Sequence, residues 1–248
     1  MILVGDSLGM TMLGFDSTLP VTMDDMVRHT AAVRRGAPNV WLVGDMPYMT
    51  YQPSVETAIR HAGRFMAECG CDAVKLEGGV EMADRIAGIA RSGIPVIGHL
   101  GLTPQSVSAL GGFKLQGKGA AQAKKIVDDA RALEEAGAFC ILLELVPDRV
   151  CRLITERAKH CIIMSLGSGP HAHGQLLIYH DAFALYPKFK PRMAKVFADA
   201  GAVIREGLAG YVKEVTEKTF PAPENWFGMA DAEYDELQRL LKGDAGDR

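Results

Sequence analysis

"AVKLEGGVEMADRIAGIARSGIPVIGH", residues 73–99, decides the fold class of this chain. Two short apolar runs, 73–77 and 95–99, flank a stretch at 80–92 whose apolar residues follow helical spacing. A strand, a helix and a second strand in succession imply parallel strands joined by a right-handed crossover. The stretch therefore predicts one repeating unit of an α/β fold.

The same alternation runs along most of the chain. Further strands are expected at 2–5, 40–44, 139–144, 161–167 and 176–180. Further helices are expected at 23–35, 53–70, 118–137 and 148–159. Thr22 and Gly36 are typical residues at the start and end of the first of these helices. The pattern fits an open doubly wound sheet or a closed barrel, and the lack of GxGxxG after the first strand counts against a dinucleotide fold.

Composition narrows the class of protein. A net charge of -3 leaves no basic surplus for phosphates, so we expect no nucleic-acid partner. The sequence has neither an apolar run of membrane-spanning length nor a signal peptide, which predicts no membrane partner and a cytoplasmic location. A mitochondrial location is the alternative for a eukaryotic protein whose leader is missing. The five cysteines lack CxxC spacing, which favours packed, reduced thiols over zinc or disulfides.

Polar residues follow five successive predicted strands at the point where each ends. They are Asp6 with Ser7, Asp45, Lys75 with Glu77, His99 and Glu144. In an α/β barrel the loops after the strands form one face, so these side chains are expected to meet there. A single one of them is better read as a helix cap or a surface carboxylate, but independent caps need not recur at every strand end.

The residue types indicate a chemistry. Asp6, Asp45 and Glu77 suit a hard divalent cation, bound directly or through water, with room for a chelating substrate. Lys75 shares a strand face with Glu77 and either neutralises a substrate carboxylate or pairs with Glu77 or Asp45. Glu144 ends an apolar strand and suits a general base. Together they predict proton abstraction beside a carbonyl, with the enolate stabilised by the metal.

Eight ordered motifs carry a family resemblance. They are "VGDSLGM", "DSTLPVTMDDMVRHTAAVRRGAP", "VGDMPYMTY", "VKLEGG", "GHLGLTPQSV", "GGFKLQGKG", "LLELVP" and "GQLLIYHD". From residue 3 to about 222 the chain resembles the 3-methyl-2-oxobutanoate hydroxymethyltransferase (ketopantoate hydroxymethyltransferase) family. The resemblance implies a (β/α)8 TIM barrel of the phosphoenolpyruvate/pyruvate type. It also implies an enzyme of pantothenate biosynthesis that transfers the one-carbon unit of 5,10-methylenetetrahydrofolate to 3-methyl-2-oxobutanoate, giving 2-dehydropantoate.

The resemblance also implies roles for individual residues. Asp6 and Asp45 would bind Mg²⁺ and contact substrate, and Glu77 would be the third metal carboxylate, although other divalent ions fit such a site. Ser7 and Lys75 would hold the oxo acid, and Glu144 would be the catalytic base. His99 would contact substrate or an intermediate, or would simply bond to a neighbouring carboxylate or the backbone. The glycine-rich loop at 110–119 is expected to cover the site, unless it is merely flexible.

The chain departs from the family in "MSLGSGPHAHGQLLIYHD", where Met164, Ser165 and Ser168 replace small or apolar residues and His173 replaces a frequent Asp. We expect these changes to tune a loop or folate contacts. A non-catalytic paralogue and a carbon-carbon lyase acting on a small 2-oxo acid remain alternative functions.

The resemblance further implies an assembly and a boundary. Family members are typically decamers, so a homo-oligomer is expected. In the family a strand and helix precede the first strand seen here, which predicts a shortened chain that lacks the first β/α unit. We expect one barrel domain at 1–222 and a tail at 223–248 that is helical and then disordered.

Overall fold

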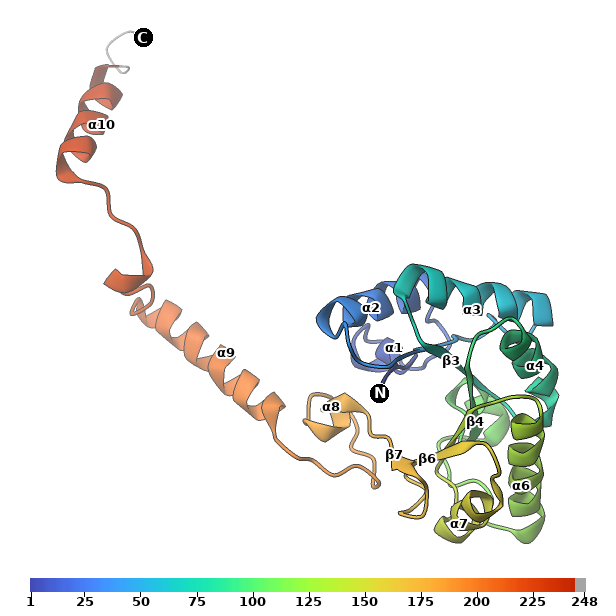
Figure 1. Cartoon of the computed structure of the whole chain (residues 1–248). Helices are drawn as coiled ribbons and strands as arrows, with labels where there is room; N and C mark the ends of the chain where they lie inside the picture. The colour runs from blue at the N-terminus through green and yellow to red at the C-terminus, as the bar shows by residue number, and fades with distance from the viewer. Residues whose placement is uncertain (244–248) are drawn as a thin grey trace.

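The computed structural model describes residues 1–243, and its central element is a parallel sheet of seven strands. The strands are β1 (Ile2–Val4), β2 (Leu42–Asp45), β3 (Ala73–Glu77), β4 (Val96–Gly101), β5 (Cys140–Glu144), β6 (Ile162–Leu166) and β7 (Gly174–Gln175). They lie side by side in chain order, and the sheet curls (Figure 1). The predicted α/β class with parallel strands is confirmed. Within residues 1–243, β1 pairs only with β2 and β7 only with β6, so the described sheet keeps two free edges.

Helices follow the strands and cover the outer face of the sheet (Figure 1). The helices of the body are α1 (Leu8–Thr11), α2 (Met23–Gly36), α3 (Val55–Cys69), α4 (Ala83–Arg91), α5 (Val107–Leu110), α6 (Ala120–Glu135), α7 (Asp148–Arg157) and α8 (Tyr179–Ala182). Each predicted helix is present close to its expected bounds, although the one at 80–92 begins as a 3-10 turn, Val80–Met82. The predicted start of α2 is confirmed, because Thr22 and Asp25 form a reciprocal capping box.

Side chains alternate between two faces of the sheet and form two apolar layers. The larger layer lies between the sheet and the helices, where Gly44 of β2 leaves room for the fully buried Phe65 of α3. The smaller layer lines the inside of the curl and contains Val43, Ala73, Ile97, Cys140, Leu142 and Leu166. The inward positions that follow these residues along the strands include Asp45, Lys75 and His99. The sheet therefore carries polar side chains above an apolar base.

The last strand differs from its prediction. A strand was expected at 176–180, but β7 is Gly174–Gln175 and pairs with Met164 and Ser165 of β6. The Leu176 N–H still donates to the Ser165 carbonyl, and α8 then begins at Tyr179. Leu176 and Ile178 line an internal cavity instead of extending the sheet. An apolar run of this length can form a strand or line a cavity, and its contacts with the rest of the fold determine which of the two it does.

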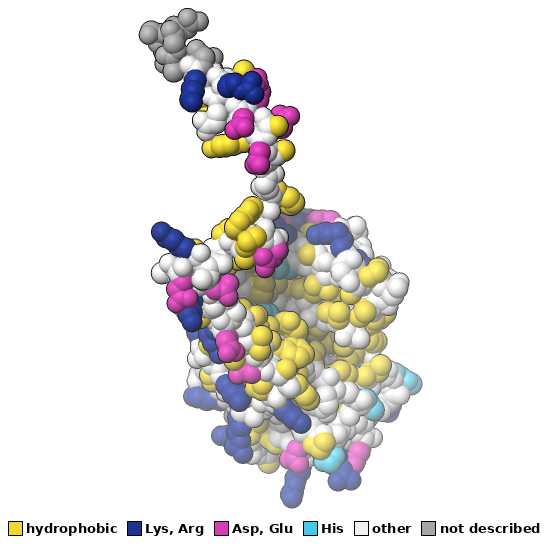
Figure 2. All heavy atoms as spheres, turned by 90° about the vertical axis from the view of Figure 1, so that its left-hand side faces the viewer, with side chains coloured by type: hydrophobic (Ala, Val, Ile, Leu, Met, Phe, Trp, Pro, Cys, Tyr) yellow, Lys and Arg dark blue, Asp and Glu magenta, His cyan; other side chains and the backbone are white. Residues whose placement is uncertain are grey.

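The chain ends in an arm that projects away from the body (Figure 1). The arm contains α9 (Ala200–Glu217), a 3-10 turn at Pro223–Asn225 and α10 (Asp231–Gly243). Its large apolar side chains are exposed, including Leu208 and Val212 on α9 and Phe227 beyond it. Figure 2 shows hydrophobic side chains on this arm and on the hollowed face of the body. α10 lies within the tail expected at 223–248, and the end of that tail, 244–248, which was expected to be disordered, lies outside the described residues.

Two predictions from the sequence, one about the cysteines and one about membrane-spanning helices, can be compared with the structure. All five cysteines are buried and free, as packed thiols should be. Across residues 1–243, none of the helices combines the length and the apolar character that crossing a bilayer requires.

Candidate functional site

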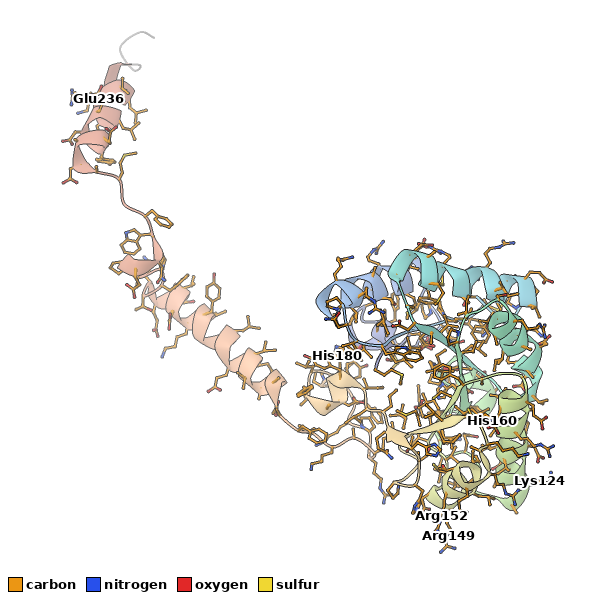
Figure 3. The ribbon with its side chains drawn as sticks, viewed as in Figure 1. Lys124, Arg149, Arg152, His160, His180 and Glu236 are labelled. Carbon is orange, nitrogen blue, oxygen red and sulfur yellow. The ribbon has the colours of Figure 1, made fainter. Side chains whose placement is uncertain are left out.

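A cavity of about 350 Å³ lies at the carboxyl ends of the strands, inside the curl of the sheet. All of the predicted site residues line it: Asp6, Ser7, Asp45, Lys75, Glu77, His99 and Glu144. Its walls are mainly apolar, and Phe113 from the predicted cover loop forms part of them. By contrast, Lys124 of α6 and Arg149 and Arg152 of α7 point outward from the helices (Figure 3). The charged residues of the cavity are therefore a separate, inward-facing set.

The register of the sheet brings the charged residues together. Asp45 of β2 is paired with Lys75 of β3, and Glu77 of β3 is paired with His99 of β4. The Lys75 Nζ lies 2.8 Å from Asp45 Oδ1 and 3.6 Å from Glu77 Oε1. Lys75 thus makes the internal ion pairs that were one of its two predicted roles.

His99 joins this cluster to Glu144. Its Nε2 lies 3.1 Å from Glu144 Oε2, and its Nδ1 lies 3.4 Å from Glu77 Oε1. Burial and the nearby Lys75 lower the pKa of His99, but hydrogen bonding to Glu144 and Glu77 outweighs them and raises it to about 9. The structure therefore places His99 between two carboxylates, which was the second of its predicted roles.

The buried carboxylates of the cluster outnumber the positive charges beside them. Burial, followed by the neighbouring Asp45, raises the pKa of Asp6 well above its ordinary value. Burial also raises the pKa of Asp45, although Lys75 opposes this. Burial would raise the pKa of Glu77 as well, but Lys75 and His99 outweigh it and lower that pKa. Lys75 and the His99 imidazolium carry two positive charges against the four carboxylates Asp6, Asp45, Glu77 and Glu144, so the cluster favours a further cation.

The donor set fits a hydrated divalent cation better than a fully protein-bound one. Among residues 1–243, no three His, Cys, Asp or Glu side chains are arranged to hold a metal ion by themselves. Apart from the cationic Lys75 and His99, Asp45 Oδ1 and Glu77 Oε1 are buried without a hydrogen-bond donor. Mg²⁺ prefers oxygen donors, usually takes one or two protein carboxylates and keeps several waters. Asp6, Asp45 and Glu77 suit such an ion if not all three bind it directly.

The backbone around Glu144 is closely fitted. Gly101 of β4 faces Glu144 with φ +92°, and a side chain there would overlap the Glu144 carbonyl. The Leu102 N–H donates to that carbonyl at 2.8 Å. Leu145, the next residue, has φ 46°, a left-handed conformation that is uncommon for a branched residue. The chain thus turns sharply after Glu144 and leaves its side chain at the cavity.

The sequence did not single out two buried residues that belong to this site. Gln105 donates from Nε2 to Asp6 Oδ2 at 2.9 Å and from its backbone N–H to Glu77 Oε2 at 3.0 Å. Tyr51 donates from its hydroxyl to Gln105 Oε1 at 2.7 Å. Their presence in "GHLGLTPQSV" and "VGDMPYMTY" was the only signal in the sequence.

The residues that depart from the family pattern support a loop. Ser168 Oγ donates to the Leu143 carbonyl at 2.8 Å and accepts from the Val146 N–H at 3.0 Å. His173 Nδ1 accepts from the Ile163 N–H at 2.9 Å. Neither Ser168 nor His173 lines the cavity. These bonds agree with the expected effect on loop structure.

Comparisons with known proteins agree with this geometry. The family model described as "Ketopantoate hydroxymethyltransferase" matches residues 1–223. The "3-methyl-2-oxobutanoate hydroxymethyltransferase" of Clostridium botulinum (strain 657 / Type Ba4) is 49% identical over 93% of this chain and 83% of its own length. The protein of the same name from Thermus thermophilus is 50% identical over 91% of this chain and 86% of its own length.

A solved structure supports the fold alone. The crystal structure of a putative phosphonomutase from Burkholderia cenocepacia has a TM-score of 0.53 and 14% identity to this chain. The match covers 87% of this chain and 83% of that one.

Proposed function

This chain belongs to the ketopantoate hydroxymethyltransferase family, and we propose that it transfers the one-carbon unit of 5,10-methylenetetrahydrofolate to 3-methyl-2-oxobutanoate. The product would be 2-dehydropantoate, a precursor in pantothenate biosynthesis. One observation carries the proposal. A carboxylate suited to act as a base, Glu144, shares a cavity with a carboxylate cluster that contains a buried lysine.

The charged floor of the cavity suits a 2-oxo acid. Asp6, Asp45 and Glu77, directly or through water, would hold Mg²⁺ or another divalent ion, which supplies positive charge for the carboxylate and the developing enolate of the substrate. Lys75 and Ser7 face the same space and would bind the substrate carboxylate and keep it in one orientation. The apolar walls would receive the branched carbon end and exclude water from it.

Glu144 is proposed to start the chemistry. Its carboxylate accepts the proton from C3 of the oxo acid, and the electrons of the C–H bond form the enolate. His99 lies 3.1 Å from Glu144 Oε2 and holds that carboxylate in place. Water replaces the two C–N bonds of the folate methylene group, which releases tetrahydrofolate and leaves the one-carbon unit at the formaldehyde level. The enolate carbon then bonds to this carbon, and the proton held by Glu144 passes to the resulting alkoxide to give the hydroxyl group. Tetrahydrofolate is released at its ordinary oxidation level, because no electrons leave the reactants.

Hydrogen exchange at C3 tests the role of Glu144. In D₂O without folate, the unmodified protein is expected to replace the C3 hydrogen of 3-methyl-2-oxobutanoate, as followed by proton NMR. Glu144→Gln keeps the shape of the side chain but removes its basicity, so exchange should stop. Glu156→Gln makes the same change on the exposed face of α7 and should leave exchange intact. Exchange at the normal rate in Glu144→Gln would rule out this base.

We also propose that the seven strands belong to a (β/α)8 barrel of the phosphoenolpyruvate/pyruvate type. The sequential strand order, the curl and the similarity to the phosphonomutase fold support this assignment. An eighth strand would pair with the free edges of β1 and β7, because a barrel closes only when every edge is paired.

We further propose that the protein is a homo-oligomer. Ile204, Leu208, Tyr211 and Val215 recur on α9 at heptad-like spacing, and all are exposed in the single chain. An exposed apolar stripe of this kind is stabilised when another apolar surface covers it and removes it from water. Light scattering after size exclusion should give a multiple of the 26.7 kDa chain mass, and a monomer over the whole concentration range would contradict the proposal.

A further inference from the structure

We propose that Gln105 is a positioning residue that fixes Asp6 and Glu77 in the orientation needed to bind a cation. The inference rests on the cation site proposed above, and it adds a neutral residue that does not itself contact the ion. Gln105 follows Pro104 in the 3-10 turn Pro104–Ser106, directly after β4, and is buried. From there it reaches two strand ends at once.

The orientation of the Gln105 amide is determined by its neighbours. One polar end lies 2.9 Å from the Met46 carbonyl oxygen, which can only accept a hydrogen bond. That end must therefore be the Nε2 amide group, and the opposite end must be the Oε1 oxygen. Oε1 accepts from the Tyr51 hydroxyl at 2.7 Å and from Gln52 Nε2 at 3.1 Å. A flipped amide would set two acceptors against each other at Met46.

With its amide in this orientation, Gln105 donates hydrogen bonds to both carboxylates. The second Nε2 hydrogen is directed to Asp6 Oδ2 at 2.9 Å, and the Gln105 backbone N–H is directed to Glu77 Oε2 at 3.0 Å. Each carboxylate thus has one oxygen tied to the same residue. The other oxygen of Glu77, Oε1, is buried and lies 3.6 Å from Lys75 Nζ and 3.4 Å from His99 Nδ1. Gln105 thus holds one oxygen of each group and leaves the second oxygen to cationic partners, as Glu77 Oε1 already shows with Lys75 and His99.

Tyr51 supports the orientation of Gln105 through hydrogen bonds. Because its hydroxyl hydrogen is directed to Gln105 Oε1, its oxygen is free to accept the Glu77 N–H at 3.2 Å. The side chain is 1% exposed and has no room to turn away. Tyr51 and Gln105 therefore form one chain of hydrogen bonds that ends on both carboxylates.

A neutral donor suits this position. A lysine or arginine would also bond to Asp6, but its positive charge would compete with the cation for the carboxylates. An amide orients the oxygen atoms without neutralising them, as residues that support metal ligands commonly do.

The experiment measures Mn²⁺ binding to the substrate-free protein by electron paramagnetic resonance, so the readout does not depend on turnover. Gln105→Leu removes the amide and should weaken Mn²⁺ affinity by about 10- to 100-fold. Tyr51→Phe removes only the hydroxyl and should weaken it less, in the same direction. Gln122→Leu, on the exposed face of α6, is the matched control and should bind like the unmodified protein.

The outcomes separate this inference from the proposed function. Unchanged Mn²⁺ affinity in both Gln105→Leu and Tyr51→Phe, with an unchanged circular dichroism spectrum, would overturn the role of Gln105 and leave the cation site in place. If the unmodified protein itself binds no Mn²⁺, the proposed cation site fails, and this inference fails with it. Weaker affinity together with an unchanged melting temperature of the metal-free protein supports positioning, because a purely structural role would lower that temperature.

Discussion

Gly44 and Phe65 provide a test of how the packing behind the sheet supports the site. A methyl group on Gly44 would lie 2.6 Å from Cγ and 2.7 Å from Cε1 of the Phe65 ring, closer than real Cβ contacts. Phe65 is fully buried on α3, so its ring cannot move aside without displacing its neighbours. Overpacking of this kind costs about 1–3 kcal/mol, and we expect Gly44→Ala to lower the free energy of unfolding by that amount.

The matched control is on the same helix as Phe65. Gly63 lies inside α3, and a methyl group added to it would meet no neighbouring atom within 4 Å, so Gly63→Ala should stabilise the protein by up to about 1 kcal/mol through helix propensity. Urea unfolding monitored by circular dichroism measures both changes, with the midpoint compared at constant slope. The same substitution is thus expected to have opposite signs at two positions.

A double variant tests the contact itself. Phe65→Leu removes ring atoms that the new methyl would meet, so Gly44→Ala combined with Phe65→Leu should lose less stability than the sum of the single changes, by about 0.5–3 kcal/mol. Asp45 follows Gly44, so activity should fall in Gly44→Ala and partly return in the double variant. Simple additivity, or a Gly44→Ala protein as stable as the unmodified one, would refute the reasoning.

Three further predictions concern the site. Lys75→Met leaves the buried Asp45 without a charged partner and should destabilise the protein by about 3–5 kcal/mol in urea unfolding, partly reversed by Mg²⁺. The exposed Lys124→Met is the control and should change stability little. Gly101→Ala should slow C3 hydrogen exchange, because the added methyl group displaces the Glu144 backbone. Gly93→Ala is the control: Gly93 also has a positive φ, but a methyl group there meets no neighbouring atom, so this variant should catalyse exchange at the normal rate. Treatment with EDTA should stop C3 exchange and added Mg²⁺ should restore it; exchange that persists in EDTA would count against the cation site.

Sequence patterns predicted the parts of the site that depend on single strands. Asp45, Lys75 and Glu77 end apolar runs, and parallel strands bring such ends to one edge of a sheet, so their meeting follows from local signals. The position of β7 did not follow, because an apolar run can line a cavity as well as form a strand. Gln105 could not be identified as part of the site, since the partners of a buried amide lie on other strands and loops.

The exposed stripe of α9 has a thermodynamic consequence. A surface that is covered only by another molecule contributes to stability by mass action, and the contribution grows as the protein concentration rises above the dissociation constant of the assembly. Dilution of the protein would then lower its stability, and the melting temperature would rise with protein concentration. If the protein assembles as proposed, its free energy of folding depends on its own concentration as well as on its sequence, through exposed side chains such as Leu208 and Tyr211.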